Sequence, residues 1–140
     1  MKATAILETV LYAVDLDAAR AFYADVMGLA LYSEVKGRHV FFRLDRQMVL
    51  IFNPDATEVP PKPGVLPVPP HGARGPGHLC FTATAAEIDG WKAHLAAKGI
   101  AIETEFTWPN RDAAKQGHSI YFRDPAGNSV EIAEARIWGL

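Results

Sequence analysis

The sequence predicts an α+β fold made of two βαβββ modules, each with one helix packed outside its sheet. Two observations carry this prediction. A strand-like run, a helix and three more strand-like runs occur in the same order twice along the 140 residues. The glycines that end the two helices, Gly28 and Gly99, lie about 70 residues apart, as do Glu8 and His78 at the first strands. Such an order favours segregated helices over a continuous parallel sheet.

The first module is expected over residues 5–53. Its first strand covers about residues 5–13, and Asp15 caps a helix whose apolar residues recur at helical spacing up to Val26. Gly28 ends this helix. Three strands should follow over about 29–35, 38–45 and 47–53, separated by tight turns at Lys36-Gly37 and Asp45-Arg46.

A connector over residues 54–76 holds eight of the ten prolines and is predicted to be extended and irregular. The second module should cover about 77–135. A strand begins at His78, and Thr84 with Glu87 forms a capping-box pattern before a helix that Gly99 closes. A strand near 100–106, a polar loop over 107–117 and a hairpin over 118–134 complete it. The whole chain, 1–140, is interpreted as a single domain.

Composition limits the classes of function. The formal net charge is -2 and no basic run stands out, so nucleic acid is not an expected partner. No apolar stretch has the length of a membrane span, and no signal peptide is evident. Cys80 is the only cysteine, which excludes an internal disulfide and fits a cytoplasmic location.

Three polar residues interrupt strands that otherwise carry apolar side chains: Glu8, His78 and Glu131. An unpaired carboxylate in such a strand is costly, so each needs a partner or must face water. Side chains alternate between the two faces of a strand, which puts His78 beside Cys80 and Thr82, away from the bulky apolar side chains. One divalent metal ion would satisfy all three residues together.

The chemistry of this set is that of a catalytic metal site. One imidazole and two carboxylates suit manganese, iron(II), magnesium, nickel or zinc. Three protein ligands leave coordination positions open for substrate, as a catalytic site requires. The metal would polarise a carbonyl, enediolate or epoxide oxygen. Glu8 or Glu131 could detach and act as a base, and the sequence does not choose between them.

Each residue also has a plainer interpretation. His78 could be a hydrogen-bonded core histidine, and Glu8 a salt-bridged strand residue. Glu131 could form an ion pair with Arg123 across the hairpin. Four further residues are candidates for substrate contact, on the last hairpin or in the polar loop, with packing or solvent exposure as the alternative: Tyr121, His118, Trp108 and Arg111.

The chain resembles the vicinal oxygen chelate superfamily, which includes glyoxalase I, extradiol dioxygenases, fosfomycin-resistance thiol transferases and bleomycin-resistance proteins. The resemblance lies in four stretches that together span almost the whole chain except the connector: Glu8–Leu16, Ala21–Leu29, Gly77–Phe81 and Tyr121–Glu131. The last stretch, with its Asp124-Pro125-Ala126-Gly127-Asn128 turn, is the most specific.

The resemblance implies curled mixed sheets around a metal cavity, with ligands from the first and last strand of each module. By position these are Glu8, His78 and Glu131. The remaining position falls on Leu50, or on Val49 if the register slips by one, and neither side chain binds metal. The resemblance also implies a homodimer, in which Glu8 of one chain would join His78 and Glu131 of the other.

Two classes of function follow. The first is a glyoxalase-like, metal-dependent enzyme that acts on a small oxygenated substrate by lyase, isomerase or thiol-transferase chemistry. The second is a metal-free protein that binds a drug or another small molecule, as bleomycin-resistance proteins do. The three ligand-type residues favour the enzyme, and Leu50 is the observation against it.

Overall fold

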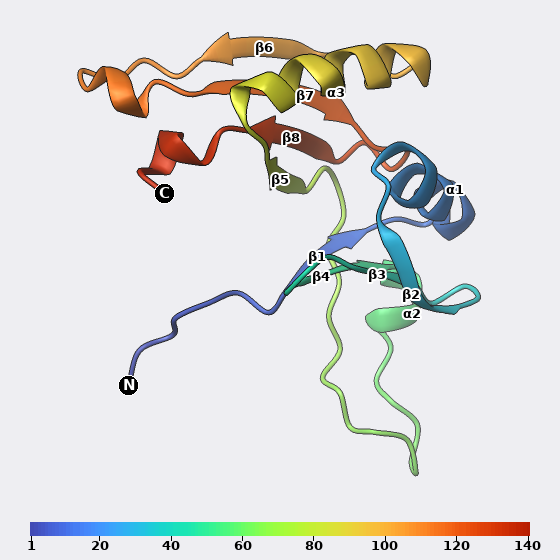
Figure 1. Cartoon of the computed structure of the whole chain (residues 1–140). Helices are drawn as coiled ribbons and strands as arrows, with labels where there is room; N and C mark the ends of the chain where they lie inside the picture. The colour runs from blue at the N-terminus through green and yellow to red at the C-terminus, as the bar shows by residue number, and fades with distance from the viewer. The chain divides into compact units, whose positions relative to one another are not determined.

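The computed structural model describes all residues from 1 to 140, and these form two compact units, residues 1–77 and 78–140 (Figure 1). Each unit contains one four-stranded mixed sheet and one main helix, so the predicted α+β fold with two βαβββ modules is confirmed. No helix combines the length and the apolar character that crossing a membrane would need.

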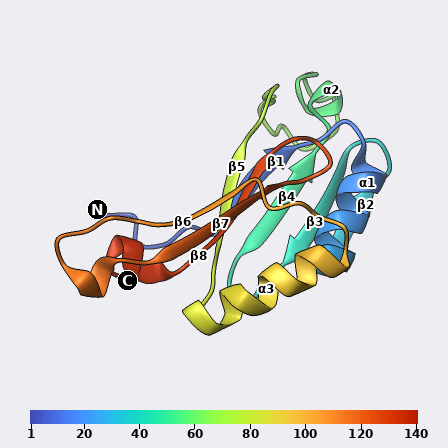
Figure 2. The ribbon, with the colours of Figure 1, turned by 90° about the horizontal axis from the view of Figure 1, so that it is seen from above.

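The sheet of the first unit has the order β1-β4-β3-β2, and Figure 2 shows these strands side by side. β1 runs parallel to β4, and the other neighbouring pairs are antiparallel. The strands lie within the predicted ranges: β1 (Glu8–Tyr12), β2 (Ala30–Val35), β3 (His39–Arg43) and β4 (Met48–Phe52).

The helix of this unit begins at the predicted cap. The Asp15 carboxylate accepts a hydrogen bond from the Ala18 N–H at 2.9 Å, and α1 (Leu16–Ala21) continues into a π-helical turn, η1 (Phe22–Val26). Gly28, at φ 69°, follows the last turn and reverses the chain toward β2, a conformation that favours glycine.

The core of the first unit lies between α1–η1 and one face of the sheet. Alternate strand residues point to this face, as the period of two requires. Fully or almost fully buried side chains meet there from the helix and the strands: Ala19, Phe22, Tyr23, Leu11, Val40, Phe42, Val49 and Ile51. The rings of Tyr23 and Phe42 lie 5.7 Å apart.

The connector is irregular apart from one short helix, α2 (Pro54–Thr57), which was not predicted. Asn53 caps α2 by accepting from the Asp55 N–H at 3.0 Å, and Pro54 stands at the first helical position, where its missing N–H costs nothing. The rest of the connector is a long loop without regular structure, as predicted.

The second unit repeats the strand order as β5-β8-β7-β6, in the yellow to red part of the ribbon in Figure 1. β5 runs parallel to β8, and the remaining pairs are antiparallel. The bounds of its elements are β5 (His78–Thr82), α3 (Ala85–Ala97), β6 (Thr104–Thr107), η2 (Ala113–Lys115), β7 (His118–Arg123), β8 (Ser129–Ala133) and η3 (Ala135–Trp138).

The predicted capping box is present in α3. The Thr84 hydroxyl accepts from the Glu87 N–H, and the Glu87 carboxylate accepts from the Thr84 N–H at 2.7 Å. The helix packs on one face of the sheet, against β7. The buried side chains of this second core come from α3, β7 and β8: Ile88, Leu95, Ile120, Phe122, Val130 and Ile132.

Candidate functional site

The two units place their candidate ligands at equivalent positions. Glu8 and His78 are the first residues of the parallel edge strands β1 and β5. In the neighbouring strands, Leu50 pairs with the third residue of β1, and Glu131 pairs with Cys80, the third residue of β5. Leu50 is therefore the counterpart of Glu131 in the first unit, whereas Val49 points to the opposite face.

Glu131 lies on the face of the second sheet that points away from α3. Its neighbours on this face are Cys80 on β5 and Tyr121 on β7, which pair with it directly. The residue is only 5% exposed, and its Oε1 atom has no hydrogen-bond partner. A buried carboxylate oxygen without a partner is costly, which makes this position a candidate for binding a metal ion or a proton.

His78 lies against the other oxygen of the same carboxylate. Its Nε2 atom is 3.3 Å from Glu131 Oε2, and its Nδ1 atom is 3.1 Å from the carbonyl oxygen of Ser129. A carbonyl oxygen only accepts, so the hydrogen-bond network assigns the proton of a neutral ring to Nδ1. Nε2 then turns its lone pair toward Glu131.

Two acceptors that face each other at this distance need a cation between or beside them. A proton on His78 Nε2 would make an ion pair, and a divalent metal ion would be bound by both side chains. A histidine that donates through one nitrogen to a backbone carbonyl and offers the other to a metal is a common ligand arrangement. The donor set of His78 and Glu131 therefore fits a metal in part. No cluster of three or more His, Cys, Asp or Glu side chains that could hold a metal is present.

The ion pair between Glu131 and Arg123, the plainer interpretation of this carboxylate, is not formed. Arg123 instead binds Glu103 through two hydrogen bonds of 2.7 and 2.9 Å. This pairing satisfies the arginine at the edge of the sheet and leaves the Glu131 carboxylate without a basic partner other than His78.

Glu8 is the third candidate ligand and belongs to the first unit. It is exposed at the start of β1, and its carboxylate forms no ion pair. The interpretation of Glu8 as a salt-bridged strand residue therefore has no partner to support it.

An aromatic row extends from His78 across the same face of the second sheet. The ring of His78 is stacked near Tyr121, with centroids 6.3 Å apart, and Tyr121 is stacked near Phe106 at 5.7 Å. Phe106 in turn lies 5.0 Å from Trp108. The Trp108 indole donates to the Ser119 hydroxyl at 2.9 Å, which fixes its orientation. This row offers flat apolar surface beside the Glu131 carboxylate.

Two titratable groups next to Glu131 are held in their neutral form. Burial, with the nearby Glu131 carboxylate, raises the pKa of the Cys80 thiol to about 12. The same two causes, burial first, raise the pKa of the Tyr121 hydroxyl. Cys80 is therefore a thiol rather than a thiolate near neutral pH, which argues against a nucleophilic role.

The remaining candidates are not brought to this face. His118 lies on the α3 side of β7, where its Nε2 atom is 3.7 Å from Glu105, which also pairs with Lys92 of α3. Arg111 is exposed in the loop after β6. Phe106 was not predicted from the sequence. Its spacing of two from Trp108 on a short strand is the signal that would have found it.

A family model matches residues 5–132, and its description is the Glyoxalase/Bleomycin resistance protein/Dioxygenase superfamily. The match covers most of the chain. The chain belongs to this superfamily. The resemblance inferred from the four sequence stretches is thereby confirmed.

Two solved structures with at least 27% identity share the fold of this chain. A lactoylglutathione lyase from Agrobacterium tumefaciens is 45% identical over 100% of both chains, with a TM-score of 0.92. A virulence protein from Salmonella typhimurium is 27% identical, with 96% of this chain and 98% of that chain covered and a TM-score of 0.70.

A more distant structure supports the fold alone. A glyoxalase/bleomycin resistance protein/dioxygenase from Nocardioides is 21% identical over 96% of this chain and 85% of that chain, with a TM-score of 0.71. Among curated proteins, none shows significant similarity to the chain.

Proposed function

We propose that this glyoxalase-superfamily chain is a metal-dependent lyase that acts on a small oxygenated substrate of the lactoyl thioester class. The observation that carries the proposal is the buried Glu131 carboxylate, with its unpartnered Oε1 atom beside His78. The similarity to a lactoylglutathione lyase at 45% identity supports the choice of lyase over isomerase or thiol-transferase chemistry.

In this proposal Glu131 and His78 are metal ligands, and Glu8 of the first unit is the third. A divalent metal bound there would polarise the substrate carbonyl and so acidify the adjacent carbon–hydrogen bond. Glu131 is also the preferred base, because its Oε1 atom has no competing hydrogen bond and can accept a proton from that carbon. Glu8, which is solvent-exposed, is the other candidate for this role.

The aromatic row would hold the substrate. Phe106 and Trp108 are 38% and 37% exposed, so their faces are accessible to a ligand on the Glu131 side of the sheet. Tyr121, whose raised pKa keeps the hydroxyl protonated, can donate a hydrogen bond to a substrate oxygen. His118 and Arg111 lie away from this face, so they would contact only a part of the substrate that extends beyond it.

A second candidate function is metal-free binding of a small molecule. It is favoured by Leu50, which stands where the second unit has Glu131 and which is buried and apolar. In that case the aromatic row would bind the ligand, and the pair of His78 and Glu131 would be a plain ion pair.

Metal binding and activity separate the two functions. Protein purified without chelator is analysed for metal content, then titrated with manganese, nickel, zinc, iron(II) and magnesium, and lactoyl thioester turnover is followed by ultraviolet absorbance. The enzyme proposal expects one metal per chain and metal-dependent turnover. Both should be lost in His78→Ala and Glu131→Gln, because removing a ligand costs the coordination energy.

Matched controls lie on the other side of the second sheet. His94→Ala on α3 and Glu105→Gln on β6 remove the same side-chain types and should leave metal content and turnover unchanged. Wild-type protein that binds none of these metals at millimolar concentration would defeat the enzyme proposal and favour plain small-molecule binding.

A further inference from the structure

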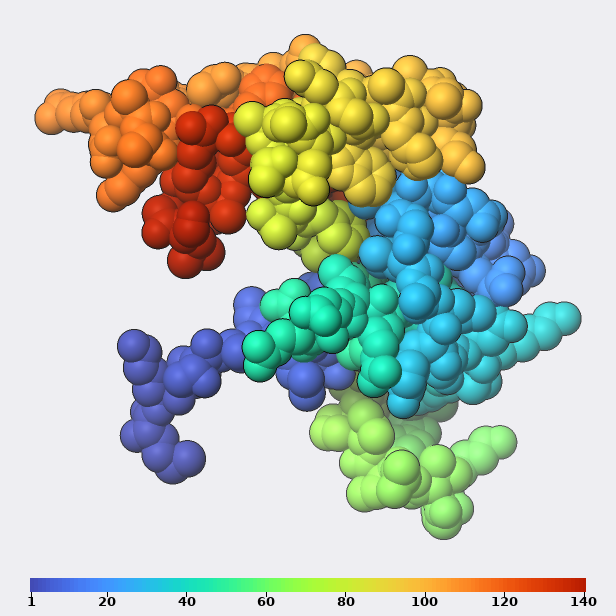
Figure 3. Space-filling model, in the orientation of Figure 1, coloured from blue at the N-terminus to red at the C-terminus, as the bar shows by residue number.

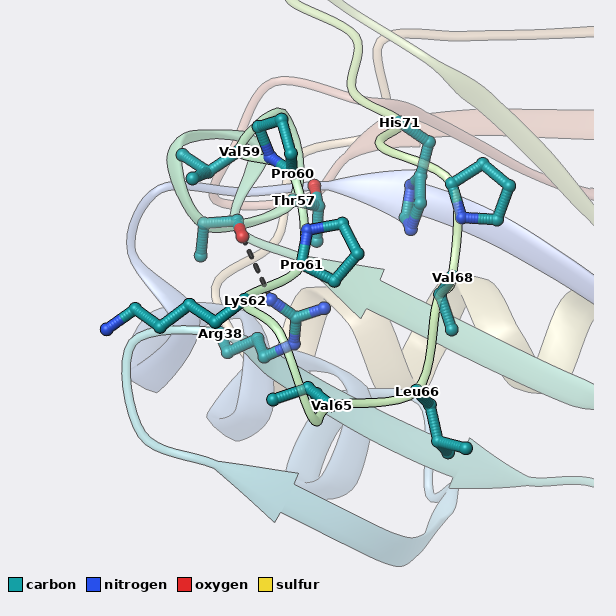
Figure 4. A pocket seen from close by; sticks show the side chains of 12 residues that line it. Arg38, Thr57, Val59, Pro60, Pro61, Lys62, Val65, Leu66, Val68 and His71 are labelled. Atoms are coloured by element: carbon teal, nitrogen blue, oxygen red, sulfur yellow. Dashed lines mark hydrogen bonds between the residues drawn. The ribbon is translucent and has the colours of Figure 1, made fainter.

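The first unit contains a cavity of about 490 Å³ between α2 and the loop of residues 58–70 that follows it (Figure 4). This volume lies in the usual range for sites that hold small molecules. All of its lining residues lie between 38 and 71, so the cavity shares no residue with the proposed metal site of Glu8, His78 and Glu131. None of the candidate site residues discussed above lines it.

The loop is closed at its base by several contacts. The backbone N–H of His71 donates to the Thr57 carbonyl at 3.0 Å, which brings the two ends of the loop together. Arg74 then binds the carboxylates of Asp55 at 2.7 Å and Glu58 at 2.8 Å. The resulting closed loop, shown in green, projects from the rest of the first unit (Figure 3). Its ends are therefore fixed while its tip is free to meet a ligand.

His71 directly follows the loop and attaches its C-terminal end to the sheet of the first unit. Its Nδ1 atom lies 2.8 Å from the hydroxyl of Tyr12 on β1, and its ring makes an edge contact with Phe52 on β4. Six prolines between residues 58 and 70 restrict the backbone further. A loop that is already ordered loses little conformational freedom when it binds, so less of the binding free energy is spent on ordering it.

The loop holds large apolar side chains in solvent. Four of them line the cavity with exposed fractions between 53% and 78%: Val59, Val65, Leu66 and Val68. Prolines 60, 61 and 69 add to the same wall. Several exposed apolar side chains gathered in one patch are typical of a binding surface.

The charge of the cavity is positive. Arg38 and Lys62 line it, and no acidic side chain does. The acidic groups nearby, Asp55 and Glu58, are paired with Arg74. Figure 4 shows the Arg38 guanidinium pointing into the hollow, where Nη1 donates to the Ala56 carbonyl at 2.9 Å, while the Lys62 side chain extends outward from the rim. The remaining N–H groups of Arg38 are available to a carboxylate, which matches the guanidinium geometry.

We propose that this cavity binds a small amphipathic monocarboxylate, with its carboxylate on Arg38 and its apolar body between the proline-rich wall and Val65, Leu66 and Val68. Lys62 attracts the anion from the rim. The site is independent of the metal site and does not require the proposed lyase activity.

Octanoate is a suitable probe, with the neutral alcohol 1-octanol and the cation octylammonium as comparisons. Calorimetry and methyl NMR of the full chain are expected to show saturable octanoate binding, with shifts confined to Val65, Leu66, Val68 and their neighbours. Arg38→Gln should weaken octanoate binding by about tenfold or more, because it removes one charge-assisted hydrogen bond to the carboxylate. The variant should bind octanol like the wild type. Lys62→Gln should weaken it by about twofold to threefold, as for an exposed charge.

Arg46→Gln at the β3–β4 turn is the matched control and should leave octanoate binding unchanged. The wild type should not bind octylammonium, because the cavity is positive, and Val68→Asp, which adds a negative charge to the wall and leaves Arg38 in place, should abolish octanoate binding. Four outcomes would overturn the proposal: no saturable octanoate binding at millimolar concentration, equal affinity for octanoate and octanol, an Arg38→Gln variant that binds octanoate like the wild type, or loop shifts that follow protein dilution instead of octanoate. The last would make the loop a contact between copies of the chain.

Discussion

At the scale of single residues, the buried Glu131 carboxylate carries a cost in stability that its proposed role as a metal ligand would explain. A buried carboxylate oxygen without a hydrogen bond destabilises the folded chain, and an apolar or neutral residue at this position would fold at least as well. The counterpart in the first unit, Leu50, shows the alternative, since it fills the equivalent strand position with an apolar side chain.

Glu131→Gln should therefore separate stability from metal binding. The amide has the same shape and no charge, so the metal-free variant should unfold at the same or a higher urea concentration than the metal-free wild type. Added metal should raise the wild-type midpoint only, because a ligand that binds the folded state stabilises it. Chemical denaturation with and without metal measures both effects.

The contrasting variant is Ile132→Ala, one residue along the same strand. Its fully buried side chain packs in the core, so truncation should cost about 2–5 kcal/mol whether or not metal is present. A Glu131→Gln variant that loses stability to the same extent would mean that the carboxylate is a structural partner.

The aromatic row gives a second prediction at this scale. Phe106→Ala should raise KM for the substrate by about threefold to tenfold and leave kcat nearly unchanged, because a ring contact is worth about 0.5–1.5 kcal/mol beyond burial. Steady-state kinetics test this. A variant that lowers kcat at constant KM would contradict a role in holding the substrate.

The residues of the site were predictable where the period of two was enough. It places His78 and Glu131 on the face away from the bulky apolar side chains, and in the structure these two lie 3.3 Å apart. The same rule puts His118 and Tyr121 on opposite faces of the sheet, because they are three positions apart on one strand. It can be applied only where the bounds of the strand are known. The partner of Arg123, Glu103, was not predictable, because it lies 20 positions earlier, just before the neighbouring strand β6.

At the scale of the elements, the capping box of α3 is the clearest local signal, and it gives a prediction of its own. Thr84→Ala should destabilise the chain by about 1 kcal/mol, since an N-cap hydroxyl satisfies an otherwise free helix N–H. Urea unfolding measures this change. Thr82→Ala, at the exposed end of β5, is the control and should cost less.

The second hydrogen bond of the capping box, from the Thr84 N–H to the Glu87 carboxylate, should make the stability of the chain depend on pH. Hydrogen bonds from the Thr84 N–H and hydroxyl lower the pKa of Glu87 below its ordinary value of 4.5. A carboxyl whose pKa is lower in the folded state stabilises the fold above the unfolded pKa and loses this contribution as pH falls through the folded one. The gap in unfolding free energy between wild type and Glu87→Gln should therefore be present at pH 6 and shrink below about pH 4.5. A gap that is constant with pH would contradict the ionised box.

Element boundaries were predicted except where the chain leaves a helix or enters the connector. The strand expected over 100–106 begins only at Thr104, because the Ile100 N–H bonds to the Leu95 carbonyl and so ends α3. The short helix α2 was not predicted because it begins at Pro54, a residue that usually breaks helices. Proline is nevertheless well suited to the first helical position, here directly after the Asn53 cap.

At the scale of the whole molecule, each unit has its own core, and the repeat explains how one chain carries two similar sheets. The long proline-rich loop could be assigned from composition, but its cavity could not, because it depends on contacts such as that between His71 and Tyr12, 59 positions apart.

The homodimer expected from the sequence gives the last prediction. If each metal site takes Glu8 from one subunit and His78 and Glu131 from the other, inactive Glu8→Gln and Glu131→Gln proteins that are unfolded and refolded together should regain about a quarter of wild-type activity. Half of the resulting dimers would be mixed, and each mixed dimer would have one intact site. No recovery, although mass spectrometry shows mixed dimers, would place all ligands in one chain, and a monomer in sedimentation would exclude the shared site.

The turn between β7 and β8 has a consequence for how distant relatives are identified. Buried Asp124 accepts hydrogen bonds from the N–H groups of Ala126 and Asn128 and from the Asn128 side chain, and this sets the register in which Tyr121 faces Glu131. The Asp124–Asn128 turn inside the most specific sequence stretch thus sets the hairpin geometry and contributes no atom to the proposed metal site. Under the proposed function, a relative can keep this turn and lose the activity through a substitution at the position of Glu131. A search by this turn would then recover metal-dependent enzymes and metal-free binding proteins alike, and the residue three places after Asn128 would be the one to inspect.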